Sequence, residues 1–194
     1  YVQVAMVVWG SYAATTGKLD SFWEWLGFIL SFSLVSGGIG ITVAHELGHK
    51  KQAIERLYSK LLLMTVCYMH FYIEHNRGHH VAVATPEDPA TARKNETFFA
   101  FWFRSVFHGY RHAWHLENES LRNKGLSEIS LKNEMIWFAT LPLLFCLLLT
   151  VIFSYGRGSI AWEVPLFFFA QSIVGFSLLE LVNYVEHYGI VRKE

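Results

Sequence analysis

Histidine is the residue type whose spacing in this chain predicts chemistry. Within two short histidine-rich groups one histidine follows another by four residues, His45 with His49 and His75 with His79, so that on a helix each pair shares one face. Two imidazoles on one helix face form a natural chelate for a metal ion. Six of the ten histidines lie in three short groups, HELGHK (45–50), EHNRGHH (74–80) and NYVEHYG (183–189), and are His45, His49, His75, His79, His80 and His187.

The composition of these groups indicates a transition metal. Imidazole suits iron, copper, nickel and zinc, whereas carboxylates and water suit magnesium and calcium. Six imidazoles are too many for one tetrahedral zinc ion, so two metal ions fit better. Each group also holds a glutamate, Glu46, Glu74 or Glu186, that would accept a hydrogen bond from a non-ligating ring nitrogen and fix the ring. Asn183 could orient His187 or cap the last helix.

The elements that must position these groups are apolar. Of the 194 residues 53% are hydrophobic and 16% aromatic, which is unusual for a soluble domain. A bilayer core about 30 Å thick requires roughly 20 apolar residues of helix. Three windows come close to this length: 22–44, 135–155 and 160–182. We expect the run 61–73 to form a short span or the return limb of a hairpin, and residues 1–14 to end another span. The sequence therefore predicts one all-α membrane-embedded domain over residues 1–194, with four or five spans.

Basic residues are distributed unevenly along this pattern. Segment 45–60 holds four, the predicted helical segment at about 77–133 holds eight, and Arg192 and Lys193 follow the last span. If the run 61–73 enters the membrane and returns, 14 of the 16 lie on one side. Because cytoplasmic flanks carry an excess of lysine and arginine, we expect this side to be cytoplasmic, in a bacterial inner membrane. The 16 basic and 16 acidic residues balance, so nothing suggests a nucleic-acid partner.

The polar segment after the second histidine group is predicted to be helical. Thr85-Pro86-Glu87-Asp88 has the pattern of a helix start, a capping threonine before a proline at the first helical position and then acids. Further on, residues 98–114 interleave aromatic side chains with Arg104, Arg111 and histidines. This mixture is expected of a helix that lies at the level of the lipid headgroups.

Four motifs in this order resemble those of the membrane di-iron alkane hydroxylases, the AlkB-type alkane 1-monooxygenases, which are related to the membrane fatty acid desaturases. They are HELGHK, EHNRGHH followed by VATPEDPA, RSVFHGYRHAWHLENE and NYVEHYG. The resemblance implies two non-haem iron ions, O2, electrons from rubredoxin, and hydroxylation of an n-alkane to a primary alcohol. It also implies that the ligands are His45, His49, His75, His79, His80 and His187.

The AlkB-type family that this sequence resembles has a further histidine box, of the form HSDHH, beyond NYVEHYG. The sequence ends at Glu194 and begins without methionine, so we expect it to be an excerpt. Three expected ligands would be missing, and the excerpt alone is expected to bind iron poorly and not to turn over.

Other interpretations remain open. The HELGH motif also fits the HExxH of intramembrane zinc proteases, in which the glutamate is the general base, but this leaves the other two groups without a role. Among related oxygenases, a fatty acyl desaturase or a xylene monooxygenase is the alternative. A transporter should have ionisable groups at the middle of its spans, whereas Glu24, Glu163 and Glu180 lie near span ends.

The remaining histidines and the cysteines have simpler expected roles. His108, His112 and His115 share the spacing of one helix face, and we expect a solvated or headgroup-facing stripe rather than a metal site. His70 is expected to pack or to form a hydrogen bond rather than to ligate. Cys67 and Cys146 lie in apolar runs and are expected to be unreactive thiols.

Overall fold

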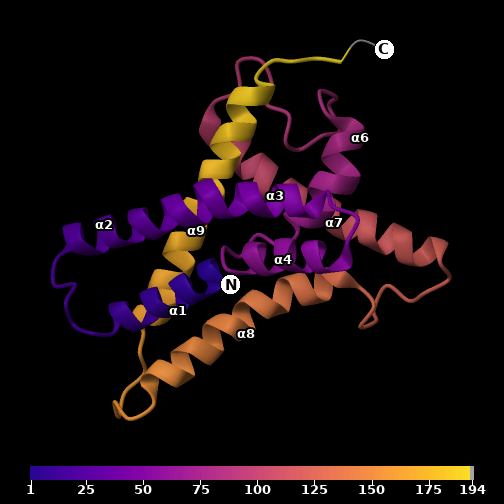
Figure 1. The fold of residues 1–194 in the computed structure, drawn as a ribbon. Coiled ribbons are helices and arrows are strands. Elements are labelled where there is room, and N and C mark those ends of the chain that lie inside the picture. Colours follow the sequence, from indigo (N-terminus) through magenta and orange to yellow (C-terminus); the bar gives the residue numbers. More distant parts are fainter. Residues whose placement is uncertain (193–194) are drawn as a thin grey trace. The chain divides into compact units, whose positions relative to one another are not determined.

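Every regular element that the structure describes is a helix (Figure 1). The structure, a computed structural model, describes residues 1–192, so Lys193 of the basic count lies outside the described residues. The chain divides into two compact units, Tyr1–Tyr68 with Thr140–Phe176, and Met69–Ala139 with the residues from Ser177 onward. We call them unit 1 and unit 2. Helices α8 (Glu134–Ser154) and α9 (Glu163–His187) contribute residues to both.

Three helical stretches are long and apolar enough to cross a membrane: Phe22–Gly48, α8 and α9. They correspond to the three long windows of the sequence, and the prediction of an all-helical membrane fold is confirmed. The first stretch runs continuously through α2 (Phe22–Ser33), the π-helix η1 (Leu34–Ile41) and α3 (Thr42–Gly48). A capping box starts it, because the Ser21 hydroxyl accepts from the Glu24 amide while the Glu24 carboxylate accepts from the Ser21 amide.

Residues 61–73 do not form one continuous helix, so the short span, one of the two alternatives expected here, is wrong. Helix α4 (Ala53–Met64) ends within this run, Cys67 has a positive φ of 52°, and a new helix, α5 (Phe71–Glu74), begins after the turn. Polar side chains bind the carbonyl groups that the end of α4 exposes: Gln171 Nε2 donates to the Thr65 carbonyl at 2.7 Å. The described residues therefore contain three candidate spans, and α1 (Val2–Ala14) is a short apolar helix.

The core of unit 1 lies between α1, α2 and the portions of α8 and α9 that belong to this unit. Phe32, Phe167 and Phe168 are its largest buried members, and Cys146 is buried among them as a free thiol. Close approach of η1 and α9 requires a missing side chain, because a Cβ at Gly37 would collide with the backbone of Gly175. Small residues at a crossing of two apolar helices allow such contact.

Unit 2 is organised by the long helix α7 (Phe98–Asn123), which Thr97 caps at its N-terminus. Every fourth residue of one face is buried, and this face packs against α5 and the π-helix η2 (His75–His79). The opposite face exposes aromatic rings. That α7 lies at the lipid headgroups stays a prediction. The buried face consists of Phe101, Ser105, Gly109, Ala113, Glu117 and Leu121.

The predicted helix start at Thr85 is wrong. After α6 (His80–Ala82) the chain forms turns and irregular structure, and the next helix begins only at Phe98. Proline at position 89 disfavours helical dihedral angles at Asp88, so a helix that began at Pro86 would end there. We call residues 83–97 the loop, and it carries Asp88 inward instead of exposing it at a helix start.

Candidate metal centre

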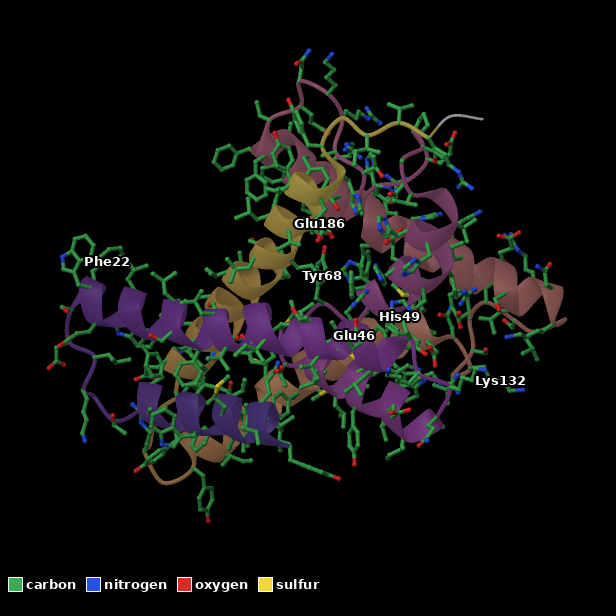
Figure 2. The ribbon with its side chains drawn as sticks, turned by 45° about the horizontal axis from the view of Figure 1, so that its top comes forward. Phe22, Glu46, His49, Tyr68, Lys132 and Glu186 are labelled. Carbon is green, nitrogen blue, oxygen red and sulfur yellow. The ribbon has the colours of Figure 1, made fainter. Side chains whose placement is uncertain are left out.

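In unit 1 a histidine pair lies near the C-terminal end of the first spanning stretch. His45 on α3 and His49, which follows its last turn, have their Nε2 atoms 3.1 Å apart, with His45 half-buried and His49 exposed. Glu46 lies beside the pair, with a carboxylate oxygen 3.4 Å from His45 Nδ1. In Figure 2, Glu46 and His49 lie at one end of the first spanning stretch and Phe22 lies at the other.

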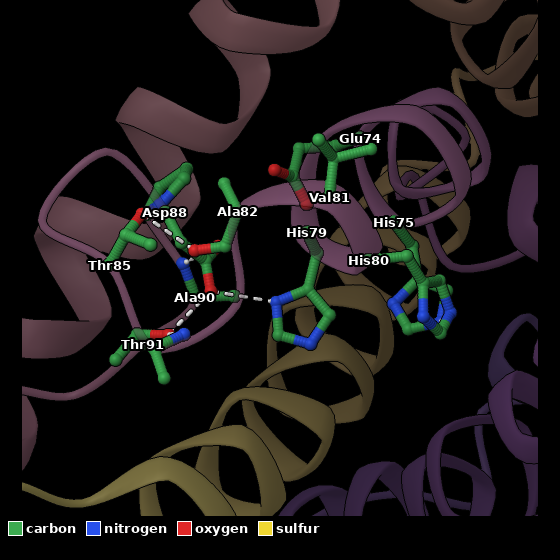
Figure 3. A network of polar contacts seen from close by, with 12 residues as sticks. Glu74, His75, His79, His80, Val81, Ala82, Thr85, Asp88, Ala90 and Thr91 are labelled. Atoms are coloured by element: carbon green, nitrogen blue, oxygen red, sulfur yellow. Dashed lines mark hydrogen bonds and ion pairs between the residues drawn. The ribbon is translucent and has the colours of Figure 1, made fainter. Parts of the chain in front are cut away.

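In unit 2 a second pair forms, by a geometry that the sequence did not predict. Residues His75–His79 are π-helical, and a π-helix brings residues five apart into register. As a result His75 Nε2 lies 3.0 Å from His80 Nε2, whereas the rings of His75 and His79 stack with their centroids 5.3 Å apart. Figure 3 shows the His75 and His80 rings together and His79 turned to another side.

His79 is buried and bonded to the loop. Its Nδ1 lies 2.8 Å from Asp88 Oδ2, and its ring centroid is 4.9 Å from that of His187 at the end of α9. Burial lowers the pKa of His79, but the hydrogen bond to Asp88 and the charges of Asp88, Glu74 and Glu180 outweigh burial, so the pKa is raised overall. For Asp88, burial raises the pKa of the carboxyl group, but the hydrogen bonds from His79 and Thr91 lower it by more. The pKa of Asp88 is therefore lowered overall.

Glu74, expected to orient a ligand ring, is buried and 3.3 Å from His112 Nδ1 on α7. This hydrogen bond raises the pKa of His112. Gly78 leaves the necessary space, because a Cβ there would lie 2.8 Å from both Glu74 Oε1 and His112 Cε1. Next to it, Arg77 donates to Glu117 Oε2 at 2.6 Å. The second histidine group is thus fixed to α7 by the polar contacts of Glu74 and Arg77.

The third group lies at the C-terminal end of α9. His187 and Asn183 are half-buried, and Glu186 is exposed (Figure 2). The assigned roles of Glu46, Glu74, Glu186 and Asn183 stay predictions, as does the set of six ligands.

Sequence reasoning did not connect two side chains, Asp88 and His112, with the second histidine group, although both contact it. His112 was grouped with His108 and His115, and those two are exposed while His112 turns toward Glu74. Asp88 was assigned to a helix start, although the proline that follows it was a signal against helix at this position.

The nitrogen separations within the two pairs fit a metal ion. Two ligands about 2.1 Å from one ion lie about 3.0 Å apart when they meet at a right angle and about 3.4 Å apart at a tetrahedral angle. The observed 3.1 Å and 3.0 Å are also ordinary hydrogen-bond distances, and they are short enough for the two imidazoles of each pair to bind one ion.

Unit 1 contains an apolar cavity of about 690 Å³. It lies along the helical stretch that carries His45, on a different face from that histidine. It follows Val35, Ile39, Val43 and Leu47. Val43 and Leu47 each lie two residues from His45, about 200° around an α-helix. The cavity therefore does not open onto the pair.

The chain is similar to one protein family and to several known proteins. The sequence profile of the fatty acid desaturase family matches residues 22–194. Alkane 1-monooxygenase 2 of Pseudomonas aeruginosa is 42% identical over 98% of the chain, and alkane 1-monooxygenase of Acinetobacter baylyi is 40% identical over 91%. The hydroxylase component XylM of the Pseudomonas putida xylene/toluene monooxygenase is 31% identical over 86%.

The chain covers 48%, 41% and 43% of the lengths of these three relatives, so it spans less than half of each. The desaturase profile, in contrast, covers most of the chain and includes all three histidine groups. Together with the three candidate spans and the paired imidazoles, this match shows that the chain belongs to the fatty acid desaturase family of membrane proteins.

Proposed function

We propose that the protein containing this chain is an alkane 1-monooxygenase. It converts an n-alkane to the primary alcohol, using O2, two electrons and two protons and releasing water. The relatives that are 42% and 40% identical carry this name. Rubredoxin is the proposed electron donor.

The observation that carries the proposal is the pairing of imidazoles. Each unit contains two Nε2 atoms about 3 Å apart, and imidazoles so close are natural ligands of one ion. We assign His45, His49, His75, His79, His80 and His187 to a centre of two iron ions, completed by ligands from the rest of the protein. Iron, when bound, supplies the reactivity toward O2 that side chains lack.

The chain's own residues hold, orient and shield this centre. An imidazole binds a metal through the ring nitrogen that carries no hydrogen. The hydrogen-bond partner of the N–H nitrogen therefore decides which of the two nitrogens can bind the metal. Rigid helices keep the donors in place, with Gly78 allowing η2 to lie against α7. An alkane offers no polar handle and dissolves in the hydrocarbon core, so apolar spans deliver it and set its position by shape alone.

The proposed location is the bacterial inner membrane, with the histidine groups facing the cytoplasm. If the three candidate spans cross the membrane in turn, 14 of the 16 basic residues lie on the same side as the histidine groups. Such an excess is typical of the cytoplasmic side. Reductant from the cytoplasm would reach the metals there, and the 77–133 segment would cover them.

The test uses the full-length protein in lipid nanodiscs with O2, rubredoxin and its reductase. We expect octane to yield 1-octanol by gas chromatography, and His75→Ala to abolish the product while His115→Ala retains it. Similarity to XylM supports a second candidate, hydroxylation of the methyl groups of xylene. Oxidation of xylene but not octane would establish this alternative. Desaturation of an acyl chain, or zinc with proteolysis, would refute both.

A further inference from the structure

The loop buries an acidic side chain against one of the assigned ligands. Asp88 is 1% exposed, and its carboxylate accepts three hydrogen bonds: from His79 Nδ1 at 2.8 Å, from the Thr91 hydroxyl at 2.5 Å and from the Ala90 amide at 3.0 Å (Figure 3). Burying a carboxylate is costly unless such partners are present. Its place is therefore set by specific contacts.

The contact with His79 has a defined direction. An ionised carboxylate only accepts hydrogen bonds, and the Thr91 hydroxyl donates to the same oxygen, Oδ2. His79 Nδ1 must then carry a hydrogen, and in the neutral ring that binds a metal the lone pair is on Nε2. Carboxylates that hold one ring nitrogen of a metal-binding histidine act in this way at other metal sites.

The loop around Asp88 is braced from several sides. Arg104 on α7 donates to the carbonyls of Pro89 and Thr91, at 3.0 Å and 2.9 Å. The Thr91 hydroxyl accepts a hydrogen bond from the Ala84 amide at 2.9 Å. The amide of Gly189, which follows α9, donates to the Ala92 carbonyl. A loop held at these points keeps the carboxylate in a fixed position against His79.

We propose that Asp88 is a positioning residue: it fixes the tautomer and the orientation of His79 so that Nε2 faces the metal. This inference rests on the proposed function, because it takes His79 as a ligand. It adds a residue that the motif pattern did not assign and gives the TPEDPA segment a role.

The test compares two carboxylate-to-amide changes in the full-length, iron-loaded protein. In Asp88→Asn the amide oxygen can take the place of Oδ1 and keep the hydrogen bond from the Ala90 amide. The NH2 group then takes the place of Oδ2, so the acceptor beside His79 Nδ1 and the Thr91 hydroxyl is lost together with the anion. Glu87→Gln makes the same change on the exposed neighbouring residue. We measure the rate at which a ferrous chelator removes iron, the 57Fe Mössbauer spectrum and the melting temperature of each.

We expect Asp88→Asn to release iron about 10- to 100-fold faster than wild type, with an altered quadrupole splitting, and Glu87→Gln to match wild type. A purely structural role would lower the melting temperature of Asp88→Asn but leave its iron release and spectrum unchanged, and this result would overturn the inference while the proposed function stands. Wild-type protein that holds no iron would refute both.

A second measurement needs no Asp88 variant and covers the case that Asp88→Asn fails to fold. In wild-type protein loaded with diamagnetic zinc, 15N-histidine spectra should show a slowly exchanging Nδ1–H proton that disappears in His79→Gln. A proton on His79 Nε2 instead would contradict the assignment.

Discussion

The ion pair between Arg104 and Glu96 should govern how tightly the loop is held. Arg104 Nε and Nη2 donate to the two Glu96 carboxylate oxygens at 2.8 Å and 2.7 Å, and both side chains are 12% exposed. The perturbation is a double-mutant cycle with Arg104→Met and Glu96→Gln, because such a cycle isolates the energy of the pair from other effects of each change.

The expected coupling energy lies between two limits. Exposed ion pairs contribute about 0.2–1 kcal/mol, and breaking a fully buried pair costs about 3–5 kcal/mol. A two-pronged, mostly covered pair should therefore contribute about 2 kcal/mol. Arg104→Met should cost more than Glu96→Gln, because it also removes the donors to the Pro89 and Thr91 carbonyls.

The assay is hydrogen–deuterium exchange of the peptide that covers residues 84–97, which reports local opening. About 2 kcal/mol corresponds to a roughly 30-fold change in exchange rate. Peptides of α8 serve as the internal reference and should be unaffected. Additive single variants, with no coupling between them, would show that the pair does not hold the loop.

Three further changes have defined outcomes. Gly78→Ala should displace Glu74 and lower the iron content of the full-length protein. Gly38→Ala, where a Cβ meets open space, should leave the iron content unchanged. Equal iron contents in the two variants would contradict the role of the close contact between Gly78 and Glu74. Gln171→Leu removes a donor to the end of α4 and should cost about 1–2 kcal/mol, measured as a lower melting temperature in detergent. The hydrogen bond from Arg104 lowers the pKa of Glu96 in the folded state, so its stabilisation is present above the ordinary carboxyl pKa and is lost as the pH falls. Loop exchange in wild type, relative to Glu96→Gln, should rise on acidification, and parallel pH profiles would refute this.

The sequence predicted the spanning helices well, because an apolar stretch of membrane length has few alternatives to a helix. It failed at 61–73, where composition alone suggested a span. The helix ends there because Gln3 and Gln171, distant in sequence, bind the exposed carbonyls. Such long-range capping has no local sequence signal.

The histidine groups were found from spacing, but their detailed pairing was not. The expectation of His75 with His79 assumed an α-helix, whereas the π-helical turn pairs His75 with His80. Asp88 was missed because its role depends on the fold of the loop against His79. Local rules pointed to the histidine groups, and tertiary contacts decided how their side chains pair.

The metal content of the full-length protein tests the central claim most directly. We expect about two irons per chain, as six or more imidazoles would bind, with iron lost in both His45→Ala and His80→Ala and retained in His108→Ala. Stoichiometric zinc, or iron that is unaffected by substitution of either pair, would contradict the claim that these imidazoles hold a di-iron centre.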